Sequence, residues 1–236
     1  MIKYFQKLFC GTKDEFLKKV KESLAKEERK FIVTANPEAF MLGEKNPDID
    51  QLLCDENTTI VADGIGIVKG AGMVGVSVAE RIPGVDIAEQ LFHFGNELKK
   101  SIYLLGAKPE VIDALVKRLN KDFPDLNIVG AVNGYVDDKD AVFQEIIAAK
   151  PDIVLVALGM PAQERLIYKH LSSFEKGIFV GVGGSFDVLS GTKERAPAFF
   201  IKHNIEWLYR IAKEPKRFKR FYDNNVKFIF RLRKMK

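Results

Sequence analysis

Cysteine and histidine are scarce in this sequence of 236 residues, and their scarcity excludes several kinds of protein. The two cysteines, Cys10 and Cys54, form no spaced pair, and three scattered histidines add no metal-ligand pattern. We therefore expect neither a disulfide framework nor a structural zinc site, which fits a reducing cytoplasm.

Long apolar runs are also missing. The longest, at residues 153–162 and 178–182, are well short of the ~20 apolar residues that a membrane-spanning helix needs. The first ten residues alternate lysine with apolar residues and contain no cleavage site, so we expect no secretory signal. A chain of this kind is expected to meet a membrane only by lying on its surface.

Negative charge is scarce at one end of the chain. Residues 193–236 contain 14 Lys and Arg against 4 Asp and Glu, a net charge of +10, whereas the remainder carries −5. A strongly basic segment joined to an acidic body predicts an anionic partner for that segment, such as anionic lipid, phosphate groups or nucleic acid.

What the sequence does contain is a regular alternation of apolar runs and amphipathic stretches, typical of βα units around a parallel sheet. Strands are predicted at residues 31–34, 59–62, 102–105, 127–131, 153–158 and 178–182, and helices at 13–28, 84–99, 109–121, 139–150 and 161–174. Six strands are too few to close a barrel of βα units. We predict an α/β body over residues 1–191, with an open, mainly parallel Rossmann-like sheet and helices on both faces.

A helical appendage is predicted over residues 192–236. Apolar residues three or four apart between Phe200 and Ile211 indicate one amphipathic helix, which Pro215 must interrupt or end before a second helix begins. The second helix carries an apolar stripe of Phe218, Phe221, Tyr222, Phe228, Ile229, Leu232 and Met235, beside a cationic stripe of Arg217, Arg220, Lys227 and Arg231. This pattern favours a helix that lies in a membrane interface. Packing on the body or on another subunit, and nucleic-acid binding, are the alternatives.

Polar residues follow several of the predicted strands, where open α/β sheets bind their ligands. Thr34 and Asn36 follow the first strand, and Asn36-Pro37 is also typical of a helix start. Asp63 follows the second strand and would serve as a helix cap or as a general base with a raised pKa. Arg81 precedes the helix at 84–99 and would hold a phosphate or carboxylate.

Three further turns offer backbone amides and hydrogen-bonding side chains. Gly106 opens a strand–glycine–helix junction whose free amides suit phosphate or ribose. Gln163 and Glu164 could bind a base or a sugar, and the glycine turn at 181–187, which includes Gly183, Gly184 and Asp187, would let a ligand approach the backbone closely.

Glycines at positions 64, 66 and 70 raise a second hypothesis, a nucleotide-dependent oxidoreductase or sugar-nucleotide modifying enzyme. The dinucleotide fingerprint needs its third glycine where Lys69 stands, so the spacing fits poorly. A non-enzymatic adaptor that uses only the basic appendage is a third hypothesis.

The turns together resemble the WecG/TagA/CpsF family of glycosyltransferases. The resemblance runs in family order over nearly the whole chain and rests on Thr34-Ala-Asn36, Ala62-Asp63-Gly64, Arg81-Ile-Pro-Gly84-Val-Asp86, Gly159-Met-Pro161-Ala-Gln163-Glu164 and Gly181-Val-Gly-Gly-Ser-Phe-Asp187. It implies an inverting transfer of N-acetylmannosamine, or a related sugar, from a UDP donor to undecaprenyl-diphosphate-linked N-acetylglucosamine, in wall teichoic acid linkage or surface polysaccharide synthesis.

The same resemblance implies roles for single residues. Asp63 matches the position proposed as the base, and Thr34, Asn36, Arg81 and Gln163 match positions that line the family's site. Arg210, Arg217 and Arg220 match arginines proposed to reach the lipid diphosphate. A peripheral place on the inner face of the cell membrane and self-association are further expectations, and nucleic acid is not an expected partner.

No metal or other cofactor is expected, since the resemblance implies a metal-independent enzyme. Two Asp-x-Asp patterns, at residues 48–50 and 138–140, resemble the metal-binding pair of other glycosyltransferases. Neither follows an apolar strand, the context in which such a pair would bind a metal.

Overall fold

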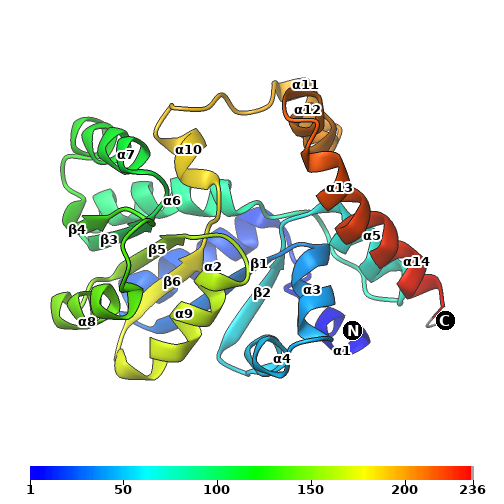
Figure 1. Ribbon diagram of the computed structural model, residues 1–236. Helices are drawn as coiled ribbons and strands as arrows, with labels where there is room; N and C mark the ends of the chain where they lie inside the picture. Colours follow the sequence, from blue (N-terminus) through cyan, green and yellow to red (C-terminus); the bar gives the residue numbers. More distant parts are fainter. Residues whose placement is uncertain (235–236) are drawn as a thin grey trace.

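The computed structural model describes residues 1–234, apart from the side chains of Arg217 and Arg220, and contains one six-stranded sheet (Figure 1). The strands are β1 (Arg29–Ala35), β2 (Thr58–Ala62), β3 (Ser101–Gly106), β4 (Asn127–Val132), β5 (Ile153–Ala157) and β6 (Gly177–Gly181). All pairs are parallel, in the order β2-β1-β6-β5-β3-β4. The predicted open parallel sheet and its six strands are confirmed.

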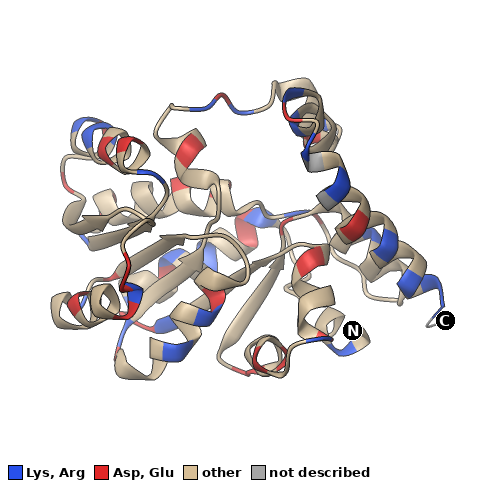
Figure 2. Cartoon of the chain, viewed as in Figure 1, with Lys and Arg blue, Asp and Glu red and all other residues tan. Residues whose placement is uncertain are grey.

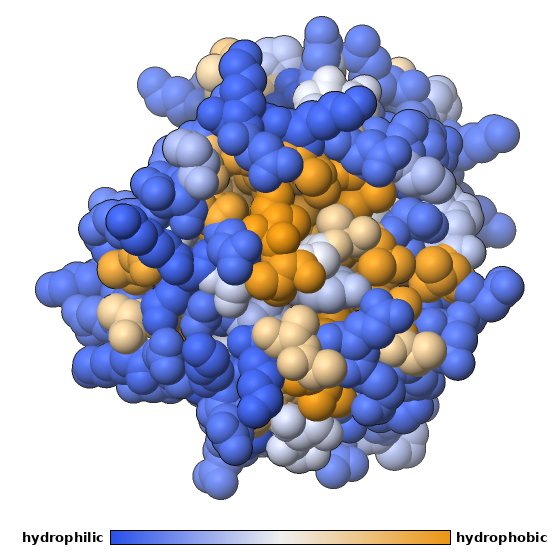
Figure 3. All heavy atoms as spheres, turned by 90° about the vertical axis from the view of Figure 1, so that its left-hand side faces the viewer, coloured by the Kyte–Doolittle hydropathy of each residue, from blue (hydrophilic) through white to orange (hydrophobic). Residues whose placement is uncertain are grey.

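The central strands form the middle layer of the core because their sequences are continuously apolar. Every residue of β5 and β6 is buried, as expected of a parallel sheet covered on both faces. Strand β4 lies at one edge and is only partly buried. Figure 3 views the molecule from that side and shows apolar side chains at the centre of the face, surrounded by hydrophilic ones.

Helices cover both faces of the sheet, as predicted. One face packs against α2 (Lys13–Ala25), α6 (Gly84–Glu97), α7 (Pro109–Asp122) and α10 (Ser185–Leu189). The other packs against α1 (Ile2–Phe5), α3 (Pro37–Gly43), α4 (Pro47–Cys54), α5 (Ile65–Met73), α8 (Lys139–Ala149) and α9 (Ala162–His170), which the short 3₁₀ helix η1 (Leu171–Ser173) follows. The five long predicted helices are confirmed, and α1, α4, α5 and α10 are helices that the pattern did not predict.

The C-terminal segment forms α11 (Ala198–Lys202), α12 (Glu206–Lys213), α13 (Arg217–Phe221), the π-helical turn η2 (Tyr222–Val226) and α14 (Lys227–Arg233). We call residues 192–234 the tail. The first predicted amphipathic helix is wrong as a single element, because it breaks into α11 and α12 at Asn204, whose φ of 57° lies in the left-handed region. Lys and Arg outnumber Asp and Glu along these helices (Figure 2).

The apolar stripe predicted for the second tail helix does not form one continuous exposed face. Phe228 and Leu232 are fully buried and share a core with Phe5. Gly70 on α5 permits this packing, since a Cβ there would lie 2.9 Å from Leu232 and 3.0 Å from Phe228. Phe218 and Tyr222, nearer the start, remain exposed. Met235 lies outside the described residues.

Among residues 1–234, no helix is both long enough and apolar enough to cross a membrane.

Candidate active site

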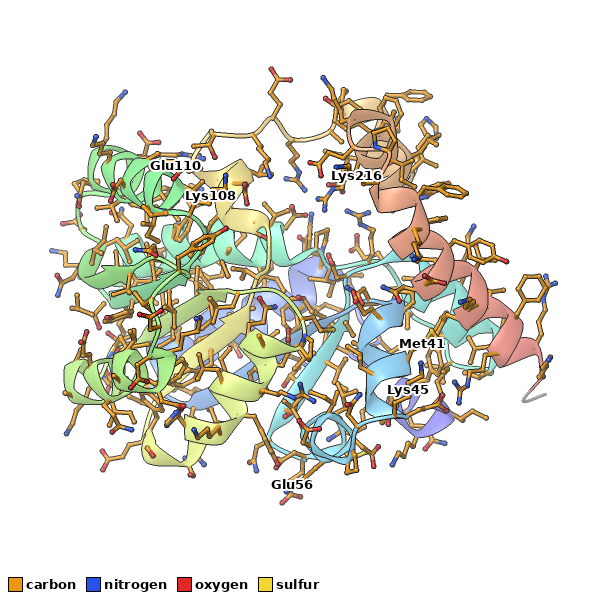
Figure 4. All side chains as sticks on the ribbon, viewed as in Figure 1. Met41, Lys45, Glu56, Lys108, Glu110 and Lys216 are labelled. Atoms are coloured by element: carbon orange, nitrogen blue, oxygen red, sulfur yellow. The ribbon has the colours of Figure 1, made fainter. Side chains whose placement is uncertain are left out.

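A cleft of about 1380 Å³ lies between the carboxyl ends of the strands and the tail. The sheet order brings the ends of β2, β1 and β6 side by side, and α12 to α14 form the opposite wall. Lys216, labelled in Figure 4, lies on the tail side of this cleft. Residues from both walls face the space, including Thr34, Asn36, Asp63, Arg81, Gln163 and Arg210.

Asp63 lies where β2 ends and α5 has not yet begun, at the floor of the cleft. Its Oδ1 accepts a hydrogen bond from the backbone N–H of Gly84, 3.2 Å away, at the start of α6. Burial raises the pKa of the Asp63 carboxyl, and this effect outweighs the neighbouring guanidinium groups of Arg81 and Arg210, which favour the ionised form. A carboxylate with a raised pKa is suited to general-base catalysis.

Thr34 and Asn36 lie beside Asp63 because β1 and β2 end together. Thr34 Oγ1 donates to the carbonyl of Gly181 at 3.0 Å, which ties the end of β1 to the end of β6. Asn36 Oδ1 accepts from the N–H of Ala39 at 3.1 Å and so caps α3, as the Asn-Pro pair predicted. Both residues line the cleft. Their catalytic roles stay a prediction.

Arg81 and Arg210 are joined by a residue that the sequence did not single out. Glu206 on α12 accepts from Arg81 Nη2 at 2.9 Å and from Arg210 Nη2 at 2.5 Å. The two arginines come from the body and from the tail, so Glu206 holds the walls of the cleft together. Its place four residues before Arg210 was the one available signal, and an i,i+4 pair on a basic helix is too common to reveal it.

Gln163 holds two glycine turns at the cleft. Its Oε1 accepts from the N–H groups of Gly159 and Gly183, each at 3.0 Å. Its Nε2 donates to Glu164 Oε1 at 2.7 Å. The carboxyl end of β6 passes close by, since a Cβ on Gly181 would lie 2.6 Å from Gln163 Nε2.

Glu164 lies behind Gln163, outside the lining of the cleft, and is 2% exposed. Burial raises its pKa to about 7, and its Oε2 has no hydrogen-bond partner. Glu164 is therefore placed behind the lining of the cleft, and its binding to a donor stays a prediction. Its contact with Gln163 is the route by which it can influence the cleft.

The remaining predicted donor-binding residues divide between two places. Gly183, Gly184 and Asp187 line the cleft at the start of α10. Gly106, at the end of β3, lies outside that lining. Its φ is 128°, and a Cβ at this position would collide with the backbone carbonyl of Ala157, so glycine is needed there. Donor binding by these residues stays a prediction.

The three arginines assigned to the acceptor diphosphate are placed unequally. Arg210 lines the cleft. Arg217 and Arg220 lie on α13, one turn apart, but their side chains lie outside the part of the chain that the structure describes.

Both Asp-x-Asp patterns already have protein partners. Asp48 pairs with Arg165 and Asp50 with Lys3, whereas Asp138 caps α8 and Asp140 pairs with Lys169. Across the part of the chain that the structure describes, no three His, Cys, Asp or Glu side chains gather as ligands for a metal ion. Metal independence stays a prediction.

Two of the glycines that raised the oxidoreductase hypothesis, Gly66 and Gly70, lie at close helix contacts, and Gly64 and Gly66 line the cleft. Gly66 lies against Pro37 and Asn225, and Gly70 lies against Phe5, Phe228 and Leu232. These glycines let α5 approach α3 and the tail closely.

Comparison with known proteins gives one consistent result. Residues 5–236 match the model of a family described as "Glycosyl transferase WecG/TagA/CpsF family". Three relatives are each named N-acetylglucosaminyldiphosphoundecaprenol N-acetyl-beta-D-mannosaminyltransferase. The Bacillus spizizenii protein is 41% identical over 80% of this chain and 74% of its own length. The Bacillus subtilis protein is 40% identical over 80% of this chain and 73% of its own length. The protein of Staphylococcus aureus strain MW2 is 36% identical over 87% of this chain and 80% of its own length.

Proposed function

The chain belongs to the WecG/TagA/CpsF family of glycosyl transferases, and we propose that it transfers N-acetylmannosamine to undecaprenyl-diphosphate-linked N-acetylglucosamine. It is a glycosyltransferase, as predicted, and its relatives favour this reading over the oxidoreductase hypothesis. We propose UDP as the carrier of the donor sugar, and wall teichoic acid linkage or another surface polysaccharide as the product that the transfer serves.

The observation that carries the proposal is the position of Asp63 in the cleft. A carboxylate with a raised pKa lies near Arg81 of the body and Arg210 of the tail, within a space that both walls enclose. A transfer from a nucleoside diphosphate to a sugar hydroxyl needs a base for the hydroxyl proton and positive charge for the departing diphosphate. A carboxylate and two guanidinium groups in one cleft support this proposal.

The proposed chemistry is a single displacement. Asp63 takes the proton of the acceptor hydroxyl as its oxygen forms a bond to the anomeric carbon of the donor sugar. The bond from that carbon to the β-phosphate oxygen breaks, and its electron pair leaves with UDP. Attack from the face opposite the leaving group inverts the anomeric configuration. A positioned base contributes roughly 10²- to 10⁴-fold to such a step.

We propose that arginine and backbone amides stabilise the diphosphate charges without a metal ion. Arg81 and the amides of the turn that includes Gly183 and Gly184 suit the UDP product, because N–H donors and guanidinium groups bind phosphate oxygens well. Arg210, with Arg217 and Arg220, is proposed for the acceptor diphosphate.

We further propose that the tail lies on the inner face of the cell membrane. Phe199, Leu208, Phe218 and Tyr222 are exposed on it, and residues 193–236 carry a net charge of +10. Exposed aromatic residues among Lys and Arg favour binding to an anionic membrane interface. The acceptor lipid stays in that membrane, so the tail would bring the cleft to its substrate.

The transfer is tested by measuring UDP release from several UDP-sugars with a short-chain lipid-diphosphate N-acetylglucosamine acceptor, with and without chelator. We expect release that depends on both UDP-N-acetylmannosamine and the acceptor. Equal release without the acceptor, or oxidation of a nicotinamide in its place, would contradict the proposal.

Membrane binding is tested separately by flotation with vesicles that contain anionic phosphatidylglycerol. We expect Phe218→Ser to reduce the bound fraction. Tyr135→Ser is the matched control, since Tyr135 is an aromatic residue of the body that is 69% exposed. An equal loss in both variants would argue against the tail as the membrane-binding surface.

A further inference from the structure

Glu206 is a buried acid in the cleft for which the proposed chemistry has no role. The residue is 6% exposed, although it lies on the tail, where most residues are exposed or half-buried. One carboxylate oxygen accepts from Arg81 and the other from Arg210. Both oxygens are therefore used, and the carboxylate bridges one guanidinium group of each wall.

This bridge bears on Asp63 through charge. Arg81 and Arg210 both favour the ionised form of Asp63, whereas the negative charge of Glu206 disfavours it. The two arginines also hold Glu206 itself in its ionised form, because they keep the pKa of its carboxyl below the ordinary value despite burial. Both arginines therefore favour the ionised form of Glu206, whose negative charge acts on Asp63.

We propose that Glu206 is a positioning residue of the transfer reaction, which holds Arg81 and Arg210 beside Asp63 and offsets their positive charge on that carboxylate. The inference rests on the proposed function, because it assumes that Asp63 is the base. With Glu206 in place, Asp63 keeps a higher proton affinity and is a stronger base. Without it, two uncompensated arginines would make Asp63 a weaker base and would repel each other.

The other charged groups around the cleft are held constant in the test. They include Glu38 of α3, Lys69 of α5, Asp187 of α10, and Arg195, Lys213 and Glu214 of the tail. Each is present in every variant compared below, so its effect on Asp63 cancels from the differences.

The test is a pH titration of Asp63 in the full-length protein. The readout is the carboxyl ¹³C NMR signal of aspartate-labelled protein, and the resonance of Asp63 is assigned as the one that Asp63→Asn lacks. We expect Glu206→Gln to move the midpoint of Asp63 downward by roughly one pH unit, and Arg210→Gln to move it upward by a similar amount. The acid limb of kcat/KM should move in the same direction in each variant. Opposite shifts from two neighbours on one helix are not expected from a general loosening of the tail.

Asp223→Asn is the matched control, because it also removes one negative charge from the tail, in an exposed pair with Lys227. We expect no shift of Asp63 from this change. An unmoved midpoint in Glu206→Gln, or an equal shift in Asp223→Asn, would overturn the inference. If Glu206→Gln does not fold, the Arg210→Gln titration decides, and the absence of an upward shift refutes the inference. A wild-type protein that releases no UDP would overturn the proposed transfer, while these titrations would still decide the effect of Glu206.

Discussion

Replacing Glu164 by glutamine should change how the stability of the protein depends on pH. Glu164 is buried and its pKa is raised to about 7, against an ordinary value of 4.5. Between these two pH values the folded protein keeps a proton that the unfolded chain has released. The contribution of Glu164 to stability is therefore greatest below pH 4.5 and is lost as pH rises toward 7. The difference between the two pKa values, about two and a half units, corresponds to about 3 kcal/mol in the free energy of unfolding.

The substitution is conservative in geometry. A glutamine at this position keeps the oxygen that accepts from Gln163 Nε2, and it removes the charge that burial disfavours. Its new N–H₂ group replaces Oε2, which has no partner, so a constant cost of about 1–3 kcal/mol is expected at every pH. Only the part of the stability difference that varies with pH reports the titration of Glu164.

The assay is urea unfolding of both proteins from pH 5 to pH 8.5. We expect the free energy of unfolding of the wild type, relative to that of Glu164→Gln, to fall by about 2–3 kcal/mol over this range. All other groups titrate in both proteins, so their contributions cancel from the difference in free energy of unfolding. Glu56→Gln is the control, since Glu56 is an exposed carboxylate (Figure 4). A difference between wild type and Glu164→Gln that stays constant with pH would refute the reasoning.

Further outcomes are expected from changes to the cleft and the tail. Asp63→Asn should lower turnover at least about 10²-fold with little change in KM, measured by UDP release; near-normal turnover would exclude it as the base. Gln163→Ala leaves the amides of Gly159 and Gly183 without their acceptor, so the KM for the donor should rise several-fold while the acceptor KM stays unchanged. Phe228→Ala should destabilise the protein by about 3–5 kcal/mol in urea unfolding, and a loss below about 1 kcal/mol would mean that the tail is not part of the core. Chelator should leave turnover unchanged, and loss of activity that Mg²⁺ or Mn²⁺ restores would refute metal independence.

Most of the fold could be predicted because its strands and helices are marked by short apolar runs and capping residues within each element. The fully buried strands β5 and β6 are short apolar runs, and Asn36-Pro37 indicates the start of α3 through its own capping bond. The sheet order then brings Thr34, Asn36 and Asp63 together, since parallel strands end at one edge.

Long-range pairing of polar groups could not be predicted. Glu206 reaches Arg81 across 125 positions in sequence, and no periodic pattern marks such a pair. Glu164 follows Gln163 in a polar stretch, so the sequence favoured a residue that hydrogen-bonds a base or a sugar, and its burial could not be predicted. Gly70 looked like part of a nucleotide motif, and its neighbours Phe228 and Leu232 became visible only once the tail had been placed on the body.

The contact between α1 and α14 also bears on how the chain reaches its native state. Phe5 and Phe228 pack with ring centroids 6.1 Å apart, although nearly the whole sequence separates them. Contacts of such high sequence separation tend to form late in folding. Until α14 arrives, Phe5 and the glycine face of α5 present an uncovered apolar surface, the kind that drives aggregation of folding intermediates. The yield of folded protein would then depend on how fast the tail closes over this surface.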